Sequence, residues 1–464
     1  MTEKEIQNYI WKNKQNWIDL LSPINFPKKI EIENPSHITP SQAIFNMIVT
    51  NYEDHFNSLF DLELIGCEVP LKKDSDSTIR ADFLGVLQGR NGLTVIELKK
   101  SRQTERQAYT ELLAYGSHLK TIFSPMSKID IGYVLISPME ERIVREATIN
   151  SILYDKNYVI ALIPKWKKND INSLTLEPWI PTFEEINNLT TSCFSGSNFN
   201  IFKVTWDALQ GDWSPEKNED DPDQDMIDKM NTVSAYAAQL MEAKGIHGFV
   251  YTMQNWSEIK NLGHLINAIV IGGINPYKAT KNRVLTTKHN LTQKQADEIS
   301  IDYFDIYQII PELKREQILE DKYEPNYLSD LSMSWDNEIA GIGFDIVKTL
   351  TKSIDKKWIE TSHGGFNWEN YQNSMEDSYC HLFEMRVTGL MRELFFEYSK
   401  LDYDFIRENG ANKHEQYWGG DIPNYLVDIS TNQYYLRNFI QRLFNPYFEY
   451  MDNIEGDDDD DDIC

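Results

Sequence analysis

The chain has 464 residues, of which 41% are hydrophobic and 12% aromatic, a composition that supports packed cores and excludes an intrinsically disordered chain. No apolar run approaches the roughly 18 residues of a membrane-spanning helix, and the first residues are charged, unlike a signal peptide. We therefore expect a cytoplasmic protein with no membrane partner. The four cysteines show no C-x-x-C spacing, which argues against a zinc ribbon or a disulfide framework.

The formal net charge of −27 has the wrong sign for nonspecific binding to the phosphates of nucleic acid. Its distribution is uneven. Residues 1–180 contain 21 basic and 23 acidic side chains, a net charge of −2, whereas the remaining 24 basic and 49 acidic side chains give −25. A basic face in the N-terminal part is therefore compatible with the total, and its candidates are Lys99, Lys100, Arg102, Arg106, Lys120 and Lys128.

The first part of the chain predicts an α/β arrangement. Residues 1–40 read as an N-terminal helical extension, with a helix from Glu3 to about Leu21 and a proline-punctuated segment after it. Ser41 is a typical N-cap for a helix that reaches about Phe60. Hydrophobic periodicity then predicts, in chain order, strands at 62–71, 78–87 and 93–100, a helix at 104–121, a strand at 129–136, a helix at 141–153 and a strand at 158–164.

The rest of the chain predicts a different domain. Residues 181–228 read as an acidic linker region, because 212–228 are rich in Asp, Glu and Pro. For residues 229–456 we expect a mainly helical domain. Its predicted elements are helices at 229–244, 332–359, 376–400 and 434–444, a strand at 248–253 and an apolar segment of undetermined type at 262–273. Residues 457–464, which begin with an uninterrupted acidic run, read as an acidic tail.

Two carboxylates and a lysine stand on neighbouring predicted strands. Asp82 lies in the strand 78–87 and the triplet Glu97-Leu98-Lys99 in the strand 93–100, with a turn at 88–92 between them. If the strands pair, both acids lie mid-strand among apolar neighbours, where an unpaired carboxylate costs several kcal/mol. One divalent cation would compensate both acids. Lys99 could be the partner instead, in a buried acid–lysine network without chemistry.

The pattern E-x-K is weak evidence when it stands alone. It recurs in this chain at Glu242, Glu258, Glu312 and Glu320. None of these four has a preceding pair of strands that carries a second acid at the right distance. Context therefore singles out Glu97.

Residues 41–180 resemble the PD-(D/E)xK nuclease superfamily, which has the restriction-endonuclease-like fold. The resemblance rests on about residues 41–165: the order helix, three strands, helix and strand, Asp82, the Glu97-x-Lys99 triplet and the helix around Tyr115. Two positions depart from the pattern. Ala81 precedes Asp82 where proline is common, and Glu111 stands where many relatives carry a glutamine.

The resemblance implies an α/β fold with a mixed sheet flanked by helices, and a Mg²⁺- or Mn²⁺-dependent nuclease that cleaves DNA, as an endonuclease rather than an exonuclease. Asp82, Glu97 and the backbone carbonyl of Leu98 would hold the metal. Lys99 would orient or help to deprotonate the attacking water and stabilise the charge that develops on the phosphate. No other cofactor is expected. Candidates for accessory roles are Glu53, Gln107, Glu111 and Tyr115. The alternative for Glu53 is a solvated surface glutamate, and the alternative for Tyr115 is core packing.

Two hypotheses follow for the whole protein. The first is a nuclease whose C-terminal domain serves regulation, target recognition or assembly, through a protein partner or as a homo-oligomer. Restriction and antiviral-defence effectors have such a layout. The second is a noncatalytic interaction protein with a degenerate nuclease fold, whose acidic part mimics nucleic acid or binds a basic partner. Its support is the charge of −25 beyond residue 180.

Overall fold

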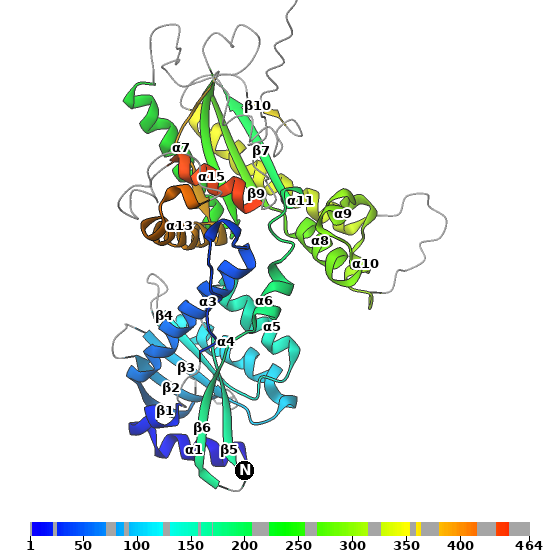
Figure 1. Ribbon diagram of the computed structural model, residues 1–464. Coiled ribbons are helices and arrows are strands. Elements are labelled where there is room, and N and C mark those ends of the chain that lie inside the picture. The colour runs from blue at the N-terminus through cyan, green and yellow to red at the C-terminus, as the bar shows by residue number, and fades with distance from the viewer. Residues whose placement is uncertain are drawn as a thin grey trace, which may run out of the picture. The chain divides into compact units, whose positions relative to one another are not determined.

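The chain divides into two structural units (Figure 1). In the computed structural model, unit 1 comprises Met1–Glu31 and Ser41–Asn187, and unit 2 comprises Ile32–Pro40 and Asn188–Cys464. The chain thus crosses between the units three times. The structure describes residues 2–21, 26–70, 80–87, 92–123, 130–155, 159–168, 170–206, 222–255, 267–313, 326–352, 359–362, 380–414 and 433–444.

Unit 1 is built on one mixed sheet of six strands in the order β1-β2-β3-β4-β5-β6. The pairs β1/β2, β2/β3 and β5/β6 are antiparallel, and the central pairs β3/β4 and β4/β5 are parallel. An α/β fold with a mixed sheet flanked by helices, as predicted from the sequence, is confirmed. Its elements are α1 (Glu3–Lys12), α2 (Trp17–Leu20), α3 (Pro40–Asn57), β1 (Leu62–Pro70), β2 (Arg80–Leu87), β3 (Gly92–Leu98), α4 (Glu105–Ile122), β4 (Asp130–Ile136), α5 (Arg142–Asn150), β5 (Val159–Lys167), β6 (Asp170–Trp179) and α6 (Phe183–Thr190).

Both faces of this sheet are covered. Helices α1, α2 and α3 pack on one face, where Phe83, Ile96 and Leu98 are buried. Helices α4 and α5 pack on the other face, over Val95 and Leu135. Because neighbouring strand residues point to opposite faces, strands covered on both sides are apolar along their length. The sequences of β3 and β4 show this property, apart from Thr94, Glu97 and Asp130.

Two helix boundaries in unit 1 differ from the sequence prediction. The predicted helix 3–21 is interrupted after Lys12 by the 3-10 turn Lys14–Asn16, where a run of polar residues breaks the apolar periodicity. Helix α3 begins at Pro40, so Ser41 lies inside the first turn and is not the cap. Proline fits the first helical position because its φ is already helical and it needs no N–H partner there. Residues 88–91 of the predicted turn lie outside the described residues.

Unit 2 is built on a second, antiparallel sheet in the order β10-β7-β9-β8-β11, with β12 also paired to β8. Helices α7 and α11 pack on one face, around Met230, Ala237 and Ile342. Helix α15 packs on the other face, where the ring of Phe444 contacts that of Phe199. The elements are β7 (Phe199–Trp206), α7 (Gln224–Ala243), β8 (Gly248–Asn255), β9 (Asn267–Ile274), α8 (Pro276–Lys288), α9 (Gln293–Glu298), α10 (Ile306–Ile309), α11 (Tyr327–Lys352), β10 (Ile359–Ser362), β11 (Cys380–Leu382), β12 (Arg386–Thr388), α13 (Leu390–Asn409) and α15 (Gln433–Phe444).

The described part of 229–456 is mainly helical, as expected, but it also contributes strands to an antiparallel sheet of which the sequence analysis predicted only one strand. Strands β8 and β9 are buried on both faces, so their sequences lack the polar alternation that separates a strand from a buried helix. The predicted helix 376–400 contains β11 and β12 before α13 begins. Strand β7 lies within the predicted linker, of which residues 207–221 are outside the described part, as is the acidic tail. None of the described helices is both long and apolar enough to cross a lipid bilayer.

The short segment Ile32–Pro40 is tied into unit 2 by a buried cluster around Asp402. The Asp402 carboxylate lies 2.7 Å from His414 Nε2 and accepts a hydrogen bond from Arg442 Nη1 at 2.6 Å. The other ring nitrogen of His414 lies 3.2 Å from the hydroxyl of Ser36. Burial opposes ionisation of Asp402, but Arg442 and His414 outweigh it and lower the pKa of Asp402 to about 2. Ser36, His414 and Asp402 are all buried, so the cluster fixes the segment Ile32–Pro40 within unit 2.

Gly116→Ala should destabilise the protein, because α4 approaches β4 so closely at Gly116 that a Cβ would lie 2.3 Å from the buried ring of Tyr133. We expect a loss of about 1–3 kcal/mol. Gly341→Ala in α11 is the matched control: its Cβ would meet nothing within 4 Å, so helix propensity should stabilise this variant by about 1 kcal/mol. Calorimetric unfolding checks the two signs. An unchanged unfolding midpoint for Gly116→Ala would contradict the close approach.

Candidate functional site

Pairing of β2 with β3 brings Asp82, Glu97 and Lys99 together. The last paired residues at this end of the hairpin are Phe83 and Ile96, and the next positions along the two strands are Asp82 and Glu97. Asp82 Oδ2 accepts a hydrogen bond of 2.8 Å from the backbone N–H of Leu98. Lys99 Nζ donates to Glu97 Oε1 at 2.5 Å. The three side chains that the sequence singled out therefore form one cluster.

The two acids are difficult to ionise together. Burial, reinforced by the neighbouring charge of Asp82, raises the pKa of Glu97 to about 9. Burial also raises the pKa of Asp82, although the N–H of Leu98 stabilises its charged form. For Lys99, burial lowers the pKa, but the carboxylates of Glu97 and Asp82 outweigh burial and raise it, so the side chain stays an ammonium. Within the cluster of Asp82, Glu97 and Lys99, the Lys99 ammonium is therefore the positive charge that faces two carboxyl groups at neutral pH.

A divalent cation fits this donor set. Glu97 is 2% exposed, and its Oε2 has no hydrogen-bond partner among the residues that the structure describes. By contrast, the buried carboxylate of Glu105 accepts hydrogen bonds from the backbone N–H groups of Glu140 and Glu141. Carboxylate oxygens are the ligands that Mg²⁺ prefers, and Mg²⁺ typically retains several waters beside one or two carboxylates. Asp82 and Glu97, with the predicted carbonyl of Leu98, are therefore an adequate but open site.

Three of the four predicted accessory residues lie around the cluster. Glu111 Oε2 is 3.5 Å from Lys99 Nζ, and Glu111 Oε1 accepts a hydrogen bond of 2.7 Å from Gln107 Nε2. Tyr115 is buried close by: burial and then the charge of Glu97 raise its pKa to about 12. Glu53 is half-buried on α3. The described residues contain no group of three or more His, Cys, Asp or Glu that could hold a metal. Glu53 therefore does not form a metal site together with Asp82 and Glu97.

Helix α1 adds two side chains that the sequence analysis missed. Gln7 Nε2 donates to Asp82 Oδ1 at 2.8 Å. Glu3 Oε1 lies 3.9 Å from Lys99 Nζ, and Glu3 Oε2 accepts from the backbone N–H of Lys100 at 3.4 Å. A signal for Gln7 was present: an amide on the same helix face as Ile10, three residues later, is buried and requires a polar partner. Nothing in the sequence distinguishes Glu3 from other acidic residues in a first helical turn.

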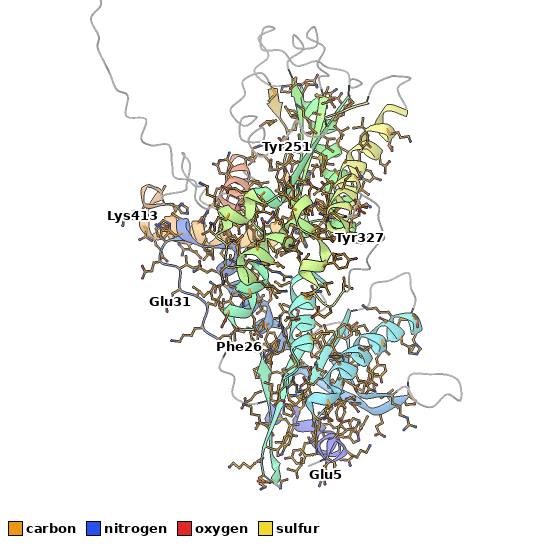
Figure 2. All side chains as sticks on the ribbon, turned by 90° about the vertical axis from the view of Figure 1, so that its right-hand side faces the viewer. Glu5, Phe26, Glu31, Tyr251, Tyr327 and Lys413 are labelled. Atoms are coloured by element: carbon orange, nitrogen blue, oxygen red, sulfur yellow. The ribbon has the colours of Figure 1, made fainter. Side chains whose placement is uncertain are left out.

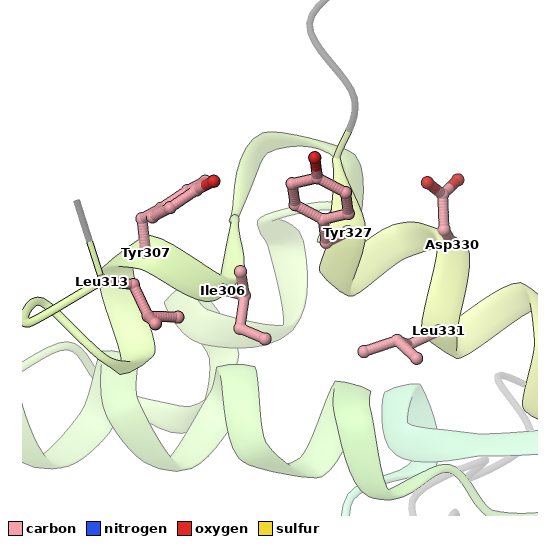
Figure 3. A pocket seen from close by; sticks show the side chains of 6 residues that line it. All are labelled: Ile306, Tyr307, Leu313, Tyr327, Asp330 and Leu331. Atoms are coloured by element: carbon pink, nitrogen blue, oxygen red, sulfur yellow. The ribbon is translucent and has the colours of Figure 1, made fainter. Parts of the chain in front are cut away.

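Unit 2 contains an apolar pocket of about 550 Å³ at the start of α11 (Figure 3). The hydroxyl of Tyr327 and the carboxylate of Asp330 point away from Ile306 and Leu331, which line its apolar part. The described lining residues include a single acid and no base, so this pocket offers neither a paired-acid metal site nor an acid–base pair. The described residues that line it are Ile306, Tyr307, Leu313, Tyr327, Asp330 and Leu331.

No protein-family model matches this sequence, and no curated protein or solved structure matches it significantly. Any assignment of function therefore depends on the geometry and the chemistry of the site itself.

Glu97→Gln should stabilise the divalent-free protein at neutral and alkaline pH. The folded pKa of Glu97, about 9, lies above the ordinary value of 4.5, so the stability contributed by the neutral acid is fully present below pH 4.5 and is lost as pH rises through 9. Glutamine accepts the same hydrogen bond from Lys99 but cannot ionise. The advantage of the variant should be small at pH 5 and grow by up to about 1.4 kcal/mol per pH unit, to roughly 4 kcal/mol by pH 8.

Thermal and urea unfolding with a chelator present, between pH 5 and pH 9, measure this difference. Glu177→Gln on β6, whose side chain is 40% exposed, is the control and should follow the parent protein at every pH. A Glu97→Gln advantage that does not change with pH would show that ionisation of Glu97 is not its cause.

Proposed function

We propose that unit 1 is a Mg²⁺- or Mn²⁺-dependent nuclease that hydrolyses phosphodiester bonds of DNA, with the restriction-endonuclease-like fold of the PD-(D/E)xK superfamily. The observation that carries the proposal is the buried Glu97 Oε2 beside Asp82, which has no hydrogen-bond partner in the described part of the chain, with the Lys99 ammonium on the same strand end. The topology adds support: α3, the antiparallel strands β1, β2 and β3, α4 and then β4 parallel to β3 follow the order on which the resemblance rests.

Each side chain of the site has a role in the proposed reaction that follows from its charge and position. Asp82, Glu97 and the carbonyl of Leu98 would hold the cation, which when bound would polarise the scissile phosphate and acidify a coordinated water. Lys99 remains protonated between Glu97 and Glu111, so it is suited to donate hydrogen bonds and positive charge to the phosphate oxygens as a water oxygen attacks phosphorus and the P–O bond breaks. Glu111 and Gln107 keep the Lys99 ammonium at that place.

The charges of unit 1 are compatible with a polyanionic substrate. The unit contains 21 basic and 24 acidic residues, a net charge of −3, whereas unit 2 carries −24. Lys100, Arg102 and Arg106 are exposed at and just before the start of α4, next to the strand end that carries Lys99. Exposed Lys and Arg supply the sequence-independent part of nucleic-acid affinity. Lys128, which the sequence placed with them, lies outside the described residues.

Purified protein should cleave DNA only when Mg²⁺ or Mn²⁺ is present. Asp82→Asn, Glu97→Gln and Lys99→Met should each lower the cleavage rate by about 100-fold or more, because each removes charge from the site of phosphoryl transfer. Gel assays on linear and circular, single- and double-stranded DNA and RNA measure the rate and identify the substrate. Lys165→Met, which breaks an exposed ion pair between β5 and β6 in the same unit, is the control and should cleave like the parent. Unchanged cleavage by Glu97→Gln protein would falsify the proposal.

A noncatalytic interaction protein is the second candidate, favoured by two observations. Lys99 and Glu97 already partner each other at 2.5 Å, as they would in a purely structural network, and unit 2 carries most of the negative charge. The candidates differ in divalent-ion binding. Calorimetric titration with Mn²⁺ should give binding that Asp82→Asn weakens if the nuclease proposal holds. No binding, together with salt-sensitive binding of a polylysine probe, would support the interaction protein.

A further inference from the structure

Helix α1 is an integral part of unit 1. Thr2 caps its N-terminus, and the carboxylate of Glu5 (Figure 2) accepts a hydrogen bond from the backbone N–H of Thr2, which completes a capping box. Ile6 and Ile10 are fully buried in the same core as Phe83 of β2. A helix anchored in this way keeps its polar side chains in fixed positions beside the sheet.

Gln7 lies on the buried side of α1 and holds one oxygen of Asp82. Its Nε2 donates to Asp82 Oδ1 at 2.8 Å, while the N–H of Leu98 donates to Asp82 Oδ2 at the same distance. Both carboxylate oxygens are thus fixed, by two elements far apart in the sequence. A carboxylate has about four acceptor positions, so two hydrogen bonds leave room for a cation.

The orientation of the Gln7 amide is set by a second contact. Lys4 Nζ, which can only donate, lies 3.1 Å from Gln7 Oε1. The carbonyl end of the amide therefore faces Lys4, and the NH₂ end faces Asp82. Lys4 is itself paired with Glu68 on β1, so a chain of contacts runs from the edge of the sheet to the acid.

We infer that Gln7 is a positioning residue that holds the Asp82 carboxylate in the orientation in which it binds the divalent cation. The inference rests on the proposed function, since it assumes that Asp82 is a metal ligand. An inhibitory role for α1 fits less well: Ile6 and Ile10 would have to leave the core before the helix could release Asp82, and Gln7 itself is only 4% exposed. Partners that orient a metal ligand commonly contribute a factor of about 10 to 100 in metal affinity.

The test compares Gln7→Met with two other variants in the full-length protein. Methionine keeps the length and the apolar packing of the side chain but has no N–H, so it removes the hydrogen bond to Asp82 without opening a cavity. Asn8→Met on the exposed side of the same helix is the matched control. Asp82→Asn defines the effect of losing the ligand. Calorimetric titration with Mn²⁺ and Mg²⁺ measures affinity, and thermal unfolding of the divalent-free variants confirms that each one folds.

Gln7→Met should weaken Mn²⁺ binding by about 10- to 100-fold, while Asn8→Met binds like the parent. At saturating metal, kcat for DNA cleavage should fall and KM for DNA should stay the same, because Gln7 acts on the metal ligand and not on the nucleic acid. In an Asp82→Asn background, Gln7→Met should have little additional effect, since its partner is already altered.

Three results would overturn the inference. If the parent binds Mn²⁺ and Asp82→Asn weakens binding, but Gln7→Met binds like the parent, the positioning role is wrong and the proposed metal site stands. If Gln7→Met weakens binding equally in both backgrounds, Gln7 does not act through Asp82. If the parent binds no divalent ion, the proposed function fails, and the inference fails with it.

Discussion

The central constraint in unit 1 is that two carboxylates, the buried Glu97 and the half-buried Asp82, occupy neighbouring positions on paired strands. The register of β2 and β3, which pairs Phe83 with Ile96, places Asp82 beside Glu97 at the next position. In a low-dielectric surrounding the two negative charges repel each other and each loses its hydration. Lys99 compensates one oxygen of Glu97, and the other oxygen is left without a protein partner among the described residues. Ionisation of both carboxylates therefore raises the free energy of the folded state, and a bound proton or cation lowers it.

Helices on both sides of the sheet in unit 1 contact the side chains of this cluster. Helix α1 approaches Asp82 through Gln7, and helix α4 approaches Lys99 through Glu111. The backbone of Lys99 is held as well, because its N–H donates to the carbonyl of Ile136 on β4 at 2.8 Å. Side chains supported by regular elements keep a productive geometry better than side chains on loops. This support from two helices and a strand is what the proposed metal site requires.

The local part of this site was predictable from the sequence, and the long-range part was not. Asp82 and Glu97 are 15 positions apart on two adjacent strands, so alternation and one turn were enough to pair them. Gln7 is 75 positions from Asp82, and no periodicity connects them. In unit 2, Gly248–Gln254 of β8 is buried throughout, so its pattern carries no information about faces. Secondary structure can be predicted from the sequence where one face of a helix or strand is exposed to water, because polar and apolar residues then alternate with its period. Pairing between distant segments depends on the tertiary fold.

The segment Ile32–Pro40 has a consequence for how the protein is made. Ser36 precedes its partner His414 by 378 residues, so the segment Ile32–Pro40 is synthesised long before the part of unit 2 that it contacts. Synthesis of strands β1 to β6 is complete at Trp179, so unit 1 can form its sheet before the residues that bind Ile32–Pro40 have been synthesised. Docking of the segment can be completed only after Arg442 has been synthesised. The order of biosynthesis thus makes the closure of unit 2 around an early piece of the chain one of its last folding steps.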